Sequence, residues 1–140
     1  MSVTVPAGAV TADVTLALEP LATPVNAAPD GTGFGGLAFL LNAFVGGVQQ
    51  QHFAFQQPVR VTVHYSDADP AGLDENTLTL QYWNGTAWAD AATTCTPTST
   101  YDRQPATNQL GVDICHLTPY ALMGPLHAPQ PTLYLPVIVR

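Results

Sequence analysis

Short stretches in which apolar and polar residues alternate, each ended by glycine or proline, are the feature that most restricts what this chain can fold into. In the clearest of them, Val59, Val61 and Val63 alternate with polar side chains. Because successive side chains of a β-strand point to opposite faces of a sheet, this stretch predicts a strand with one buried face. Similar alternation, or a continuous apolar run, recurs at residues 3–5, 14–18, 34–45, 52–55, 78–82, 110–114 and 120–123. The pattern favours an all-β fold.

The connections between these stretches are rich in turn formers. The chain holds 13 prolines and 11 glycines, and these residues set the backbone dihedrals that turns require. About nine or ten short strands with regular turns predict an antiparallel β-sandwich. We expect residues 1–124 to form the sandwich, and residues 125–140 to form a proline-rich linker followed by an edge strand or a surface-sorting tail. A length of 140 residues provides one such domain and excludes a multi-domain enzyme.

Charge is scarce and mostly negative. Charged residues make up 9% of the chain, which excludes a disordered or coiled-coil protein. There is no lysine, and the net charge at pH 7 is -7. Nucleic acid and anionic membrane surfaces would repel such a chain, so we expect neither as a partner. No apolar run approaches the roughly 18 residues that cross a bilayer, so we expect no membrane span. We also expect no cofactor.

The chain has two cysteines, Cys95 and Cys115. A lysine-free, acidic chain rich in threonine and proline is typical of extracellular or cell-surface proteins, so we predict that the two form a disulfide. Two buried free thiols are the alternative, and a single pair without further ligand spacing does not predict a metal site. No secretory signal is visible, because the chain begins in strand-like sequence. We expect it to be a piece of a longer secreted protein.

The strongest turn signal is Asn84-Gly85, which lies between Trp83 and Trp88. Both central positions of a type I′ turn need positive φ, so the pair predicts a hairpin with this turn. Residues 93–108 are polar and contain two prolines, which predicts a long loop held at its base by the disulfide. Near the N-terminus, residues 3–5 and 14–18 are expected to form a first hairpin-like unit around a proline-glycine bend.

The connection at residues 66–75 is acidic. Its carboxylates belong to Asp67, Asp69, Asp74 and Glu75. These oxygens could ligate calcium, but their spacing matches no EF-hand loop and a proline interrupts it. The alternative is a solvated turn.

Two histidines and three aromatic residues are further candidates for ligand binding. His52 and His64 lie on predicted strands without the Asp or Cys spacing of a metal site, which favours surface or core histidines. Tyr82, Trp83 and Trp88 could stack on a sugar, although aromatic hairpins more often pack against a core. A carbohydrate platform is therefore the minor alternative.

The densest motif follows the second cysteine. Residues 113–123 read Asp-Ile-Cys-His-Leu-Thr-Pro-Tyr-Ala-Leu-Met. This segment resembles the autoproteolysis site of GPCR autoproteolysis-inducing (GAIN) domains, in which a cysteine-containing strand reaches His-Leu-Thr and continues into an apolar strand. Residues 3–10, Val-Thr-Val-Pro-Ala-Gly-Ala-Val, resemble the opening strand and turn of ZU-type domains, whose ZU-UPA relatives include members cleaved at a similar site.

The resemblance implies self-cleavage of the bond between Leu117 and Thr118. In a strained turn, Thr118 Oγ would attack the Leu117 carbonyl while His116 takes the hydroxyl proton, and water would hydrolyse the resulting ester. The expected partners are then the chain's own C-terminal fragment, retained by strand pairing, and other domains of a parent surface protein. The alternative is a non-catalytic structural or adhesive module in which His116 and Thr118 satisfy turn hydrogen bonds.

The C-terminal end is strongly apolar. Residues 135–140, Leu-Pro-Val-Ile-Val-Arg, resemble short arginine-ended tails on surface proteins of some filamentous bacteria. Residues 133–139 are too apolar to leave in water, so we expect them to form an ordered last strand. Pro136 has no N–H to donate, which predicts that this strand lies at a sheet edge.

Overall fold

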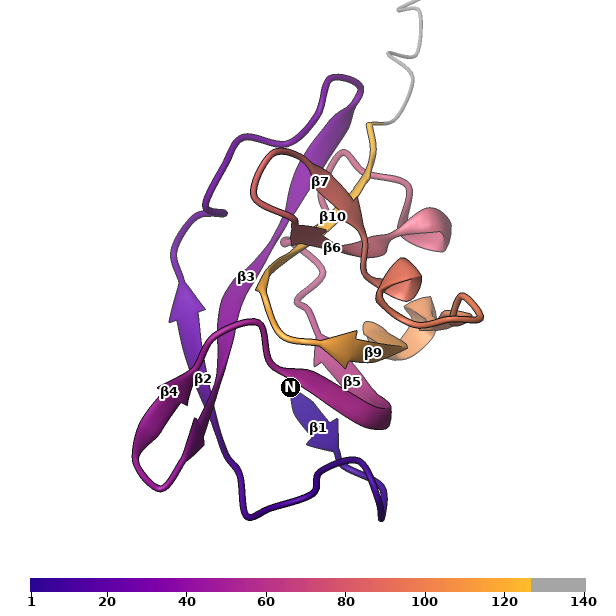
Figure 1. The fold of residues 1–140 in the computed structure, drawn as a ribbon. Helices are drawn as coiled ribbons and strands as arrows, with labels where there is room; N and C mark the ends of the chain where they lie inside the picture. The colour runs from indigo at the N-terminus through magenta and orange to yellow at the C-terminus, as the bar shows by residue number, and fades with distance from the viewer. Residues whose placement is uncertain (127–140) are drawn as a thin grey trace, which may run out of the picture.

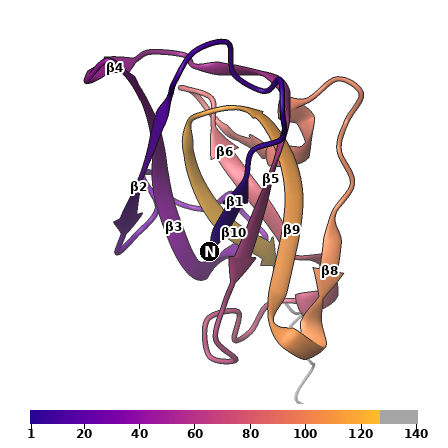
Figure 2. The ribbon, with the colours of Figure 1, turned by 90° about the horizontal axis from the view of Figure 1, so that it is seen from below.

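Two antiparallel sheets packed face to face make up the computed structural model, which describes residues 1–126 (Figures 1 and 2). The first sheet has the order β1 (Ser2–Thr4), β5 (Ala54–His64), β9 (Gln109–His116) and β8 (Asp102–Gln104). The second has the order β2 (Thr15–Leu21), β3 (Thr32–Val45), β10 (Pro119–Pro125), β6 (Thr79–Trp83) and β7 (Trp88–Asp90), with β4 (Val48–Gln50) paired to β3. Three single-turn 3₁₀ helices are η1 (Glu75–Thr77), η2 (Ala91–Thr94) and η3 (Pro105–Thr107). The predicted antiparallel β-sandwich is confirmed.

The core lies between the two sheets, where the alternating strands turn their apolar faces inward. On β5, Val59, Val61 and Val63 are each at most 1% exposed, and alternate residues of β9 are buried opposite them. The second sheet contributes a stacked aromatic pair, Phe39 and Tyr120, whose ring centroids lie 5.5 Å apart. Burial of these side chains is the main source of stability in such a sandwich.

Strand β10 is buried on both faces, which explains why its residues are apolar without alternation. Tyr120 and Leu122 point into the core between the sheets. Ala121 and Met123 belong to a second, smaller cluster, which Trp88 helps to cover. The strand lies in the middle of its sheet, paired with β3 on one side and β6 on the other. Within residues 1–126, no helix is long and apolar enough to cross a membrane.

The chain passes from one sheet to the other between β9 and β10. β9 ends at His116 and β10 begins at Pro119, so Leu117 and Thr118 form the corner that joins the two layers. Figure 2 shows this corner as an arch linking the two strands. The His-Leu-Thr motif therefore lies at one of the places where the chain crosses from one sheet to the other.

The predicted N-terminal hairpin is wrong. β1 pairs with β5 in the first sheet, and β2 pairs with β3 in the second. The residues between them cross from one layer to the other and bury Ala9, which is 1% exposed. The Ala9 carbonyl accepts a hydrogen bond from the Gln56 N–H, which fixes this crossing against β5. The proline-glycine bend thus redirects the chain between sheets and does not fold it back on itself.

The β6–β7 hairpin is present, but its predicted turn type is wrong. Trp83 pairs with Trp88 across a four-residue connection. A type I′ turn with Asn84 and Gly85 at its centre needs positive φ at both residues, but of these two only Gly85 has it. Asn84 Oδ1 accepts hydrogen bonds from the N–H groups of Thr86 and Ala87. These bonds provide the turn that left-handed backbone at Asn84 would otherwise supply.

Two other connections differ from the sequence-based interpretation. The predicted long loop at residues 93–108 contains a short strand, β8, and the 3₁₀ helix η3. A glycine-proline pair favours a turn, but Gly124 and Pro125 continue β10 and pair with β3. A glycine pair inside a strand often marks a bulge, and β3 has one at Gly35 and Gly36, because residues 35–37 lie opposite Leu122 alone. The predicted strand at residues 133–139 lies outside the described residues.

Candidate functional site

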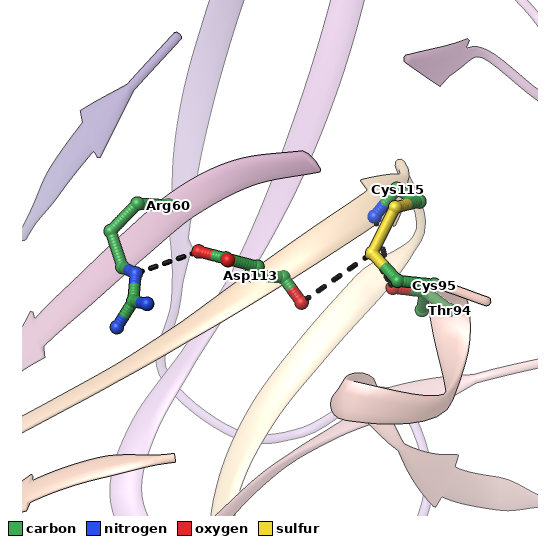
Figure 3. Close-up of polar contacts among 5 residues, drawn as sticks. All are labelled: Arg60, Thr94, Cys95, Asp113 and Cys115. Carbon is green, nitrogen blue, oxygen red and sulfur yellow. Dashed lines mark hydrogen bonds and ion pairs between the residues drawn. A yellow bond between two sulfur atoms is a disulfide. The ribbon is translucent and has the colours of Figure 1, made fainter. Parts of the chain in front are cut away.

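The predicted disulfide is confirmed and lies just before the corner (Figure 3). Cys95 and Cys115 are bonded with an S–S distance of 2.02 Å and a Cα–Cα distance of 5.0 Å. The bond ties the end of η2 to the end of β9. Thr94 Oγ1 accepts a hydrogen bond of 3.0 Å from the Cys115 N–H, which adds a second link at the same place. The approach to the corner is therefore held both covalently and by a hydrogen bond.

Two further contacts hold β9 beside the disulfide. The Cys95 sulfur lies 3.7 Å from the Asp113 carbonyl oxygen. The Asp113 carboxylate forms an ion pair of 2.7 Å with Arg60 on the neighbouring strand β5, and both side chains are about one third exposed (Figure 3). Ion pairs with this exposure stabilise a fold only weakly, so the disulfide is the dominant restraint.

The polar groups of the corner are engaged in local hydrogen bonds. The Tyr120 hydroxyl donates to the His116 carbonyl oxygen at 2.6 Å. The Leu117 N–H donates to the Phe53 carbonyl oxygen at 3.0 Å, and the Leu117 side chain is buried. Thr118 Oγ1 donates to the Pro119 carbonyl oxygen at 3.3 Å. These bonds stabilise the crossing between the sheets.

The His116 imidazole is half-buried and packs edge-on against the Tyr82 ring, with centroids 5.1 Å apart and an interplanar angle of 80°. Burial lowers the pKa of His116 below 6.5, so its imidazole is neutral at pH 7. Among the described residues, no hydrogen bond joins this ring to the Thr118 hydroxyl. Within residues 1–126, the non-glycine residues with positive φ are His52 and Asn108. Neither lies in the corner, so the corner carries no left-handed backbone strain.

The corner opens onto a groove with a volume of about 690 Å³. Its lining comes from four segments: residues 40–43 of β3, residues 49–54 from β4 to the first residue of β5, residues 82–85 of the β6–β7 hairpin, and residues 116–119 of the corner. The fold thus brings the His-Leu-Thr motif together with His52, Tyr82 and Trp83, which are distant in the sequence. His64, at the end of β5, does not line this groove.

The aromatic residues of the hairpin are divided between two roles. Tyr82 and Trp83 line the groove. Trp88 packs against the smaller apolar cluster, and its indole N–H donates to the Ala27 carbonyl oxygen at 3.1 Å. The two indoles contact each other edge to face, with centroids 5.5 Å apart. Trp88 therefore does not line the groove with the other two rings, and it packs against Trp83 instead.

Several polar residues of the groove had no predicted role. Asn42 interrupts the apolar run of β3, and its Oδ1 accepts a hydrogen bond of 3.1 Å from Gln49 Nε2. Gln50 and Gln51 continue the lining beside it. The available signals were a polar residue inside an apolar strand and three consecutive glutamines, but neither pattern reveals that they face one groove.

The acidic residues of the 66–75 connection make separate structural contacts. Asp67 accepts a hydrogen bond from Asn108, Asp69 from the Ser66 N–H, and Asp74 from the Asn76 N–H at the start of η1. Burial, together with a hydrogen bond to Glu75, raises the pKa of Tyr65 to about 12. Across residues 1–126, no three His, Cys, Asp or Glu side chains lie close enough together to hold a metal ion. The carboxylates act here as turn and cap residues.

Comparison of the chain with protein family models, with characterised proteins and with solved structures finds no match. The GAIN and ZU resemblances are therefore likenesses of two short segments. The function has to be inferred from the geometry of the corner and the groove.

Proposed function

We propose that this chain is a non-catalytic module of an extracellular or cell-surface protein, with a structural or adhesive role. The hydrogen bonding of the corner carries the proposal. The Thr118 hydroxyl donates to the carbonyl of the residue that follows it, and the carbonyl that precedes Leu117 is held by Tyr120. A nucleophile needs its hydroxyl within hydrogen-bond reach of a base, and here that hydroxyl is committed elsewhere.

The disulfide and the composition support the extracellular location. A structural disulfide persists in oxidising compartments and is rare in reducing ones. The absence of lysine and the net charge of -7 fit the same environment, since acidic surfaces stay dissociated from anionic polymers and membranes. The partners of such a module are the other domains of its parent surface protein and the ligand that it presents or holds.

The test is the intact mass of the purified protein in denaturing conditions, before and after prolonged incubation at neutral pH. We expect a single mass for each chain, that of the uncleaved wild type and that of uncleaved Thr118→Ala. Release of a fragment that begins at Thr118 in the wild type, and its absence in Thr118→Ala, would overturn the proposal.

Self-cleavage of the Leu117–Thr118 bond is the second candidate, and one observation favours it. His116 is neutral at pH 7 because burial lowers its pKa, and it lies two residues from Thr118 on the wall of an open groove that admits water. A change of the Thr118 side-chain rotamer would free its hydroxyl from the Pro119 carbonyl.

The balanced chemistry of this candidate needs no further reagent than water. Thr118 Oγ bonds to the Leu117 carbonyl carbon, His116 accepts the hydroxyl proton, and the proton passes to the Thr118 nitrogen as the peptide C–N bond breaks. Water then hydrolyses the ester, which leaves a carboxylate at Leu117 and restores the hydroxyl. β10 would remain paired between β3 and β6, so the fragments would separate only on denaturation.

Thr118→Ser separates this candidate from chance hydrolysis. The serine hydroxyl can still attack the Leu117 carbonyl, so a self-cleaving chain should retain some cleavage in this variant and lose all of it in Thr118→Ala. A fragment that forms equally in Thr118→Ala would contradict the self-cleavage mechanism.

A further inference from the structure

The groove is uncharged although the chain is strongly acidic. None of its lining residues is Asp, Glu, Lys or Arg, whereas the whole chain carries a net charge of -7. A phosphate or an acidic peptide would find no cationic partner in it, and a metal ion would find no carboxylate. The charge of the lining thus selects for a neutral ligand.

The polar groups of the lining are nevertheless numerous, and they can both donate and accept hydrogen bonds. Amides come from Asn42, Gln49 and Gln50, and His116 provides an imidazole. Asn42 and Gln49 are hydrogen-bonded to each other, and Gln50 Nε2 donates to the Val48 carbonyl oxygen at 3.0 Å, so the amides are held in position. An amide both donates and accepts hydrogen bonds, as does a neutral imidazole. Such groups complement a ligand whose surface repeats hydroxyl groups.

The aromatic rings of the groove are held in place by their neighbours. Trp83 is braced by the edge-to-face contact with Trp88, which is itself anchored through its hydrogen bond to Ala27. Tyr82 is braced in the same way by His116. A fixed aromatic ring offers an apolar face against which the C–H face of a sugar ring can pack.

The backbone at the rim of the groove is held in an unusual conformation. His52 is exposed and has a φ of 51°, in the left-handed region that residues with a side chain rarely occupy. The next residue, Phe53, is held by the hydrogen bond from Leu117 and by an edge-on contact with Phe55. His52 and Phe53 both line the groove.

We propose that the groove binds a short neutral saccharide, which packs on Trp83 and forms hydrogen bonds to the amides of β3 and β4. The volume of about 690 Å³ is in the range of about 300–1,000 Å³ that small-ligand sites occupy. The inference rests on the adhesive form of the proposed function, since it names the class of ligand that such a module would hold.

The experiment titrates the intact full-length chain with neutral oligosaccharides, namely cello-, manno- and N-acetylchito-oligosaccharides, and follows calorimetry and tryptophan fluorescence. Oligogalacturonate serves as the charged comparison, and an uncharged extended peptide as the other class of ligand. We expect saturable binding of at least one neutral saccharide, a shift of the tryptophan emission, and no binding of oligogalacturonate.

Variants locate the binding in the groove. Trp83→Ala should weaken binding at least tenfold, Trp83→Phe should retain part of it, and Gln50→Ala should weaken it independently. Gln57→Ala, an exposed amide on β5 outside the groove, is the matched control and should bind as the wild type does. Near-ultraviolet circular dichroism checks that each variant remains folded.

Binding of none of the neutral saccharides, binding of the peptide alone, or equal binding by the folded Trp83→Phe, Gln50→Ala and wild-type chains would overturn the inference. These outcomes differ from a failure of the proposed function, which appears as a cleaved chain in the intact-mass measurement. A full-length chain that binds no saccharide sinks only the assignment of the ligand.

Discussion

Removal of the disulfide by the double substitution Cys95→Ala and Cys115→Ala should destabilise the protein without unfolding it. Alanine is chosen because Cys95 is buried, at 5% exposure, and a serine hydroxyl would have to be accommodated there. The segment that the bond closes contains β8, η3 and most of β9. β8 pairs with β9, and this pairing remains when the covalent link is absent.

The expected loss of stability follows from the length of the closed loop. The two cysteines are 20 residues apart in the sequence, and in the loop-closure model a cross-link of this span stabilises the fold by about 3 kcal/mol. The contacts that remain at the same place, above all the hydrogen bond from the Cys115 backbone to Thr94, are present in the variant as well. For a chain of this size, about 3 kcal/mol corresponds to a decrease in melting temperature of roughly 10 °C.

Urea denaturation followed by tryptophan fluorescence measures the change in the free energy of unfolding, and thermal unfolding gives the change in melting temperature. Wild-type protein unfolded with a phosphine reductant should match the double variant. The control is Thr94→Ala, which keeps the disulfide and removes a hydroxyl that accepts from the Cys115 N–H and donates to the Ala91 carbonyl oxygen. It should cost about 1–2 kcal/mol. A loss below 1 kcal/mol in the double variant, or a larger loss in Thr94→Ala, would refute the reasoning.

Three other changes test separate parts of the fold. Gly36→Ala places a Cβ 2.6 Å from Asp69 at a φ of 85°, so it should lower the free energy of unfolding in urea by about 2 kcal/mol or more. The control is Gly72→Ala, which has a φ of 82° and open space around it and therefore tests the backbone strain alone. An equal loss in the two variants would show that the clash is absent. Tyr101→Phe removes hydroxyl contacts to β6 and to Asp90 and should cost about 1–3 kcal/mol. Because burial raises the pKa of Tyr101 above 10.0, the wild type should lose stability as the pH rises beyond 10 and Tyr101→Phe should lose less; parallel alkaline curves would contradict this. Burial lowers the pKa of His116 below 6.5, so the neutral imidazole contributes to the free energy of unfolding above pH 6.5, and this contribution is lost as the pH falls below that value. His116→Gln should therefore lose less stability than the wild type at acidic pH. An equal loss in both chains would assign the acid sensitivity to other groups.

The sequence predicted the strands well because their signal is local. The alternation in β5 and β9 requires only that one face of each strand be buried, and this holds whatever its neighbours are. The disulfide was predictable from composition, since a chain with two cysteines has a single way to pair them within itself. The hairpin at Asn84 was also predicted, but its turn type was not. The turn is formed by hydrogen bonds to the Asn84 side chain, and backbone dihedral preferences do not predict such bonds.

Which strands belong to the same sheet was decided by the tertiary structure. β1 and β2 are close in the sequence but lie in different layers, because their edges pair with β5 and β3. Pairing of this kind depends on contacts between distant segments, and local periodicity does not encode it.

The groove is the feature that only the tertiary structure decided. Asn42, Trp83 and His116 come from three separate strands, and each by itself is compatible with an ordinary position on a sheet. They meet because the chain changes layers at Leu117 and Thr118, next to the β6–β7 hairpin. By itself, the sequence predicted a β-sandwich with one disulfide and few charged residues, most of them acidic, since burial patterns and composition are properties of the local sequence. The surface that the sandwich offers to a ligand arises from packing between segments that are distant along the chain.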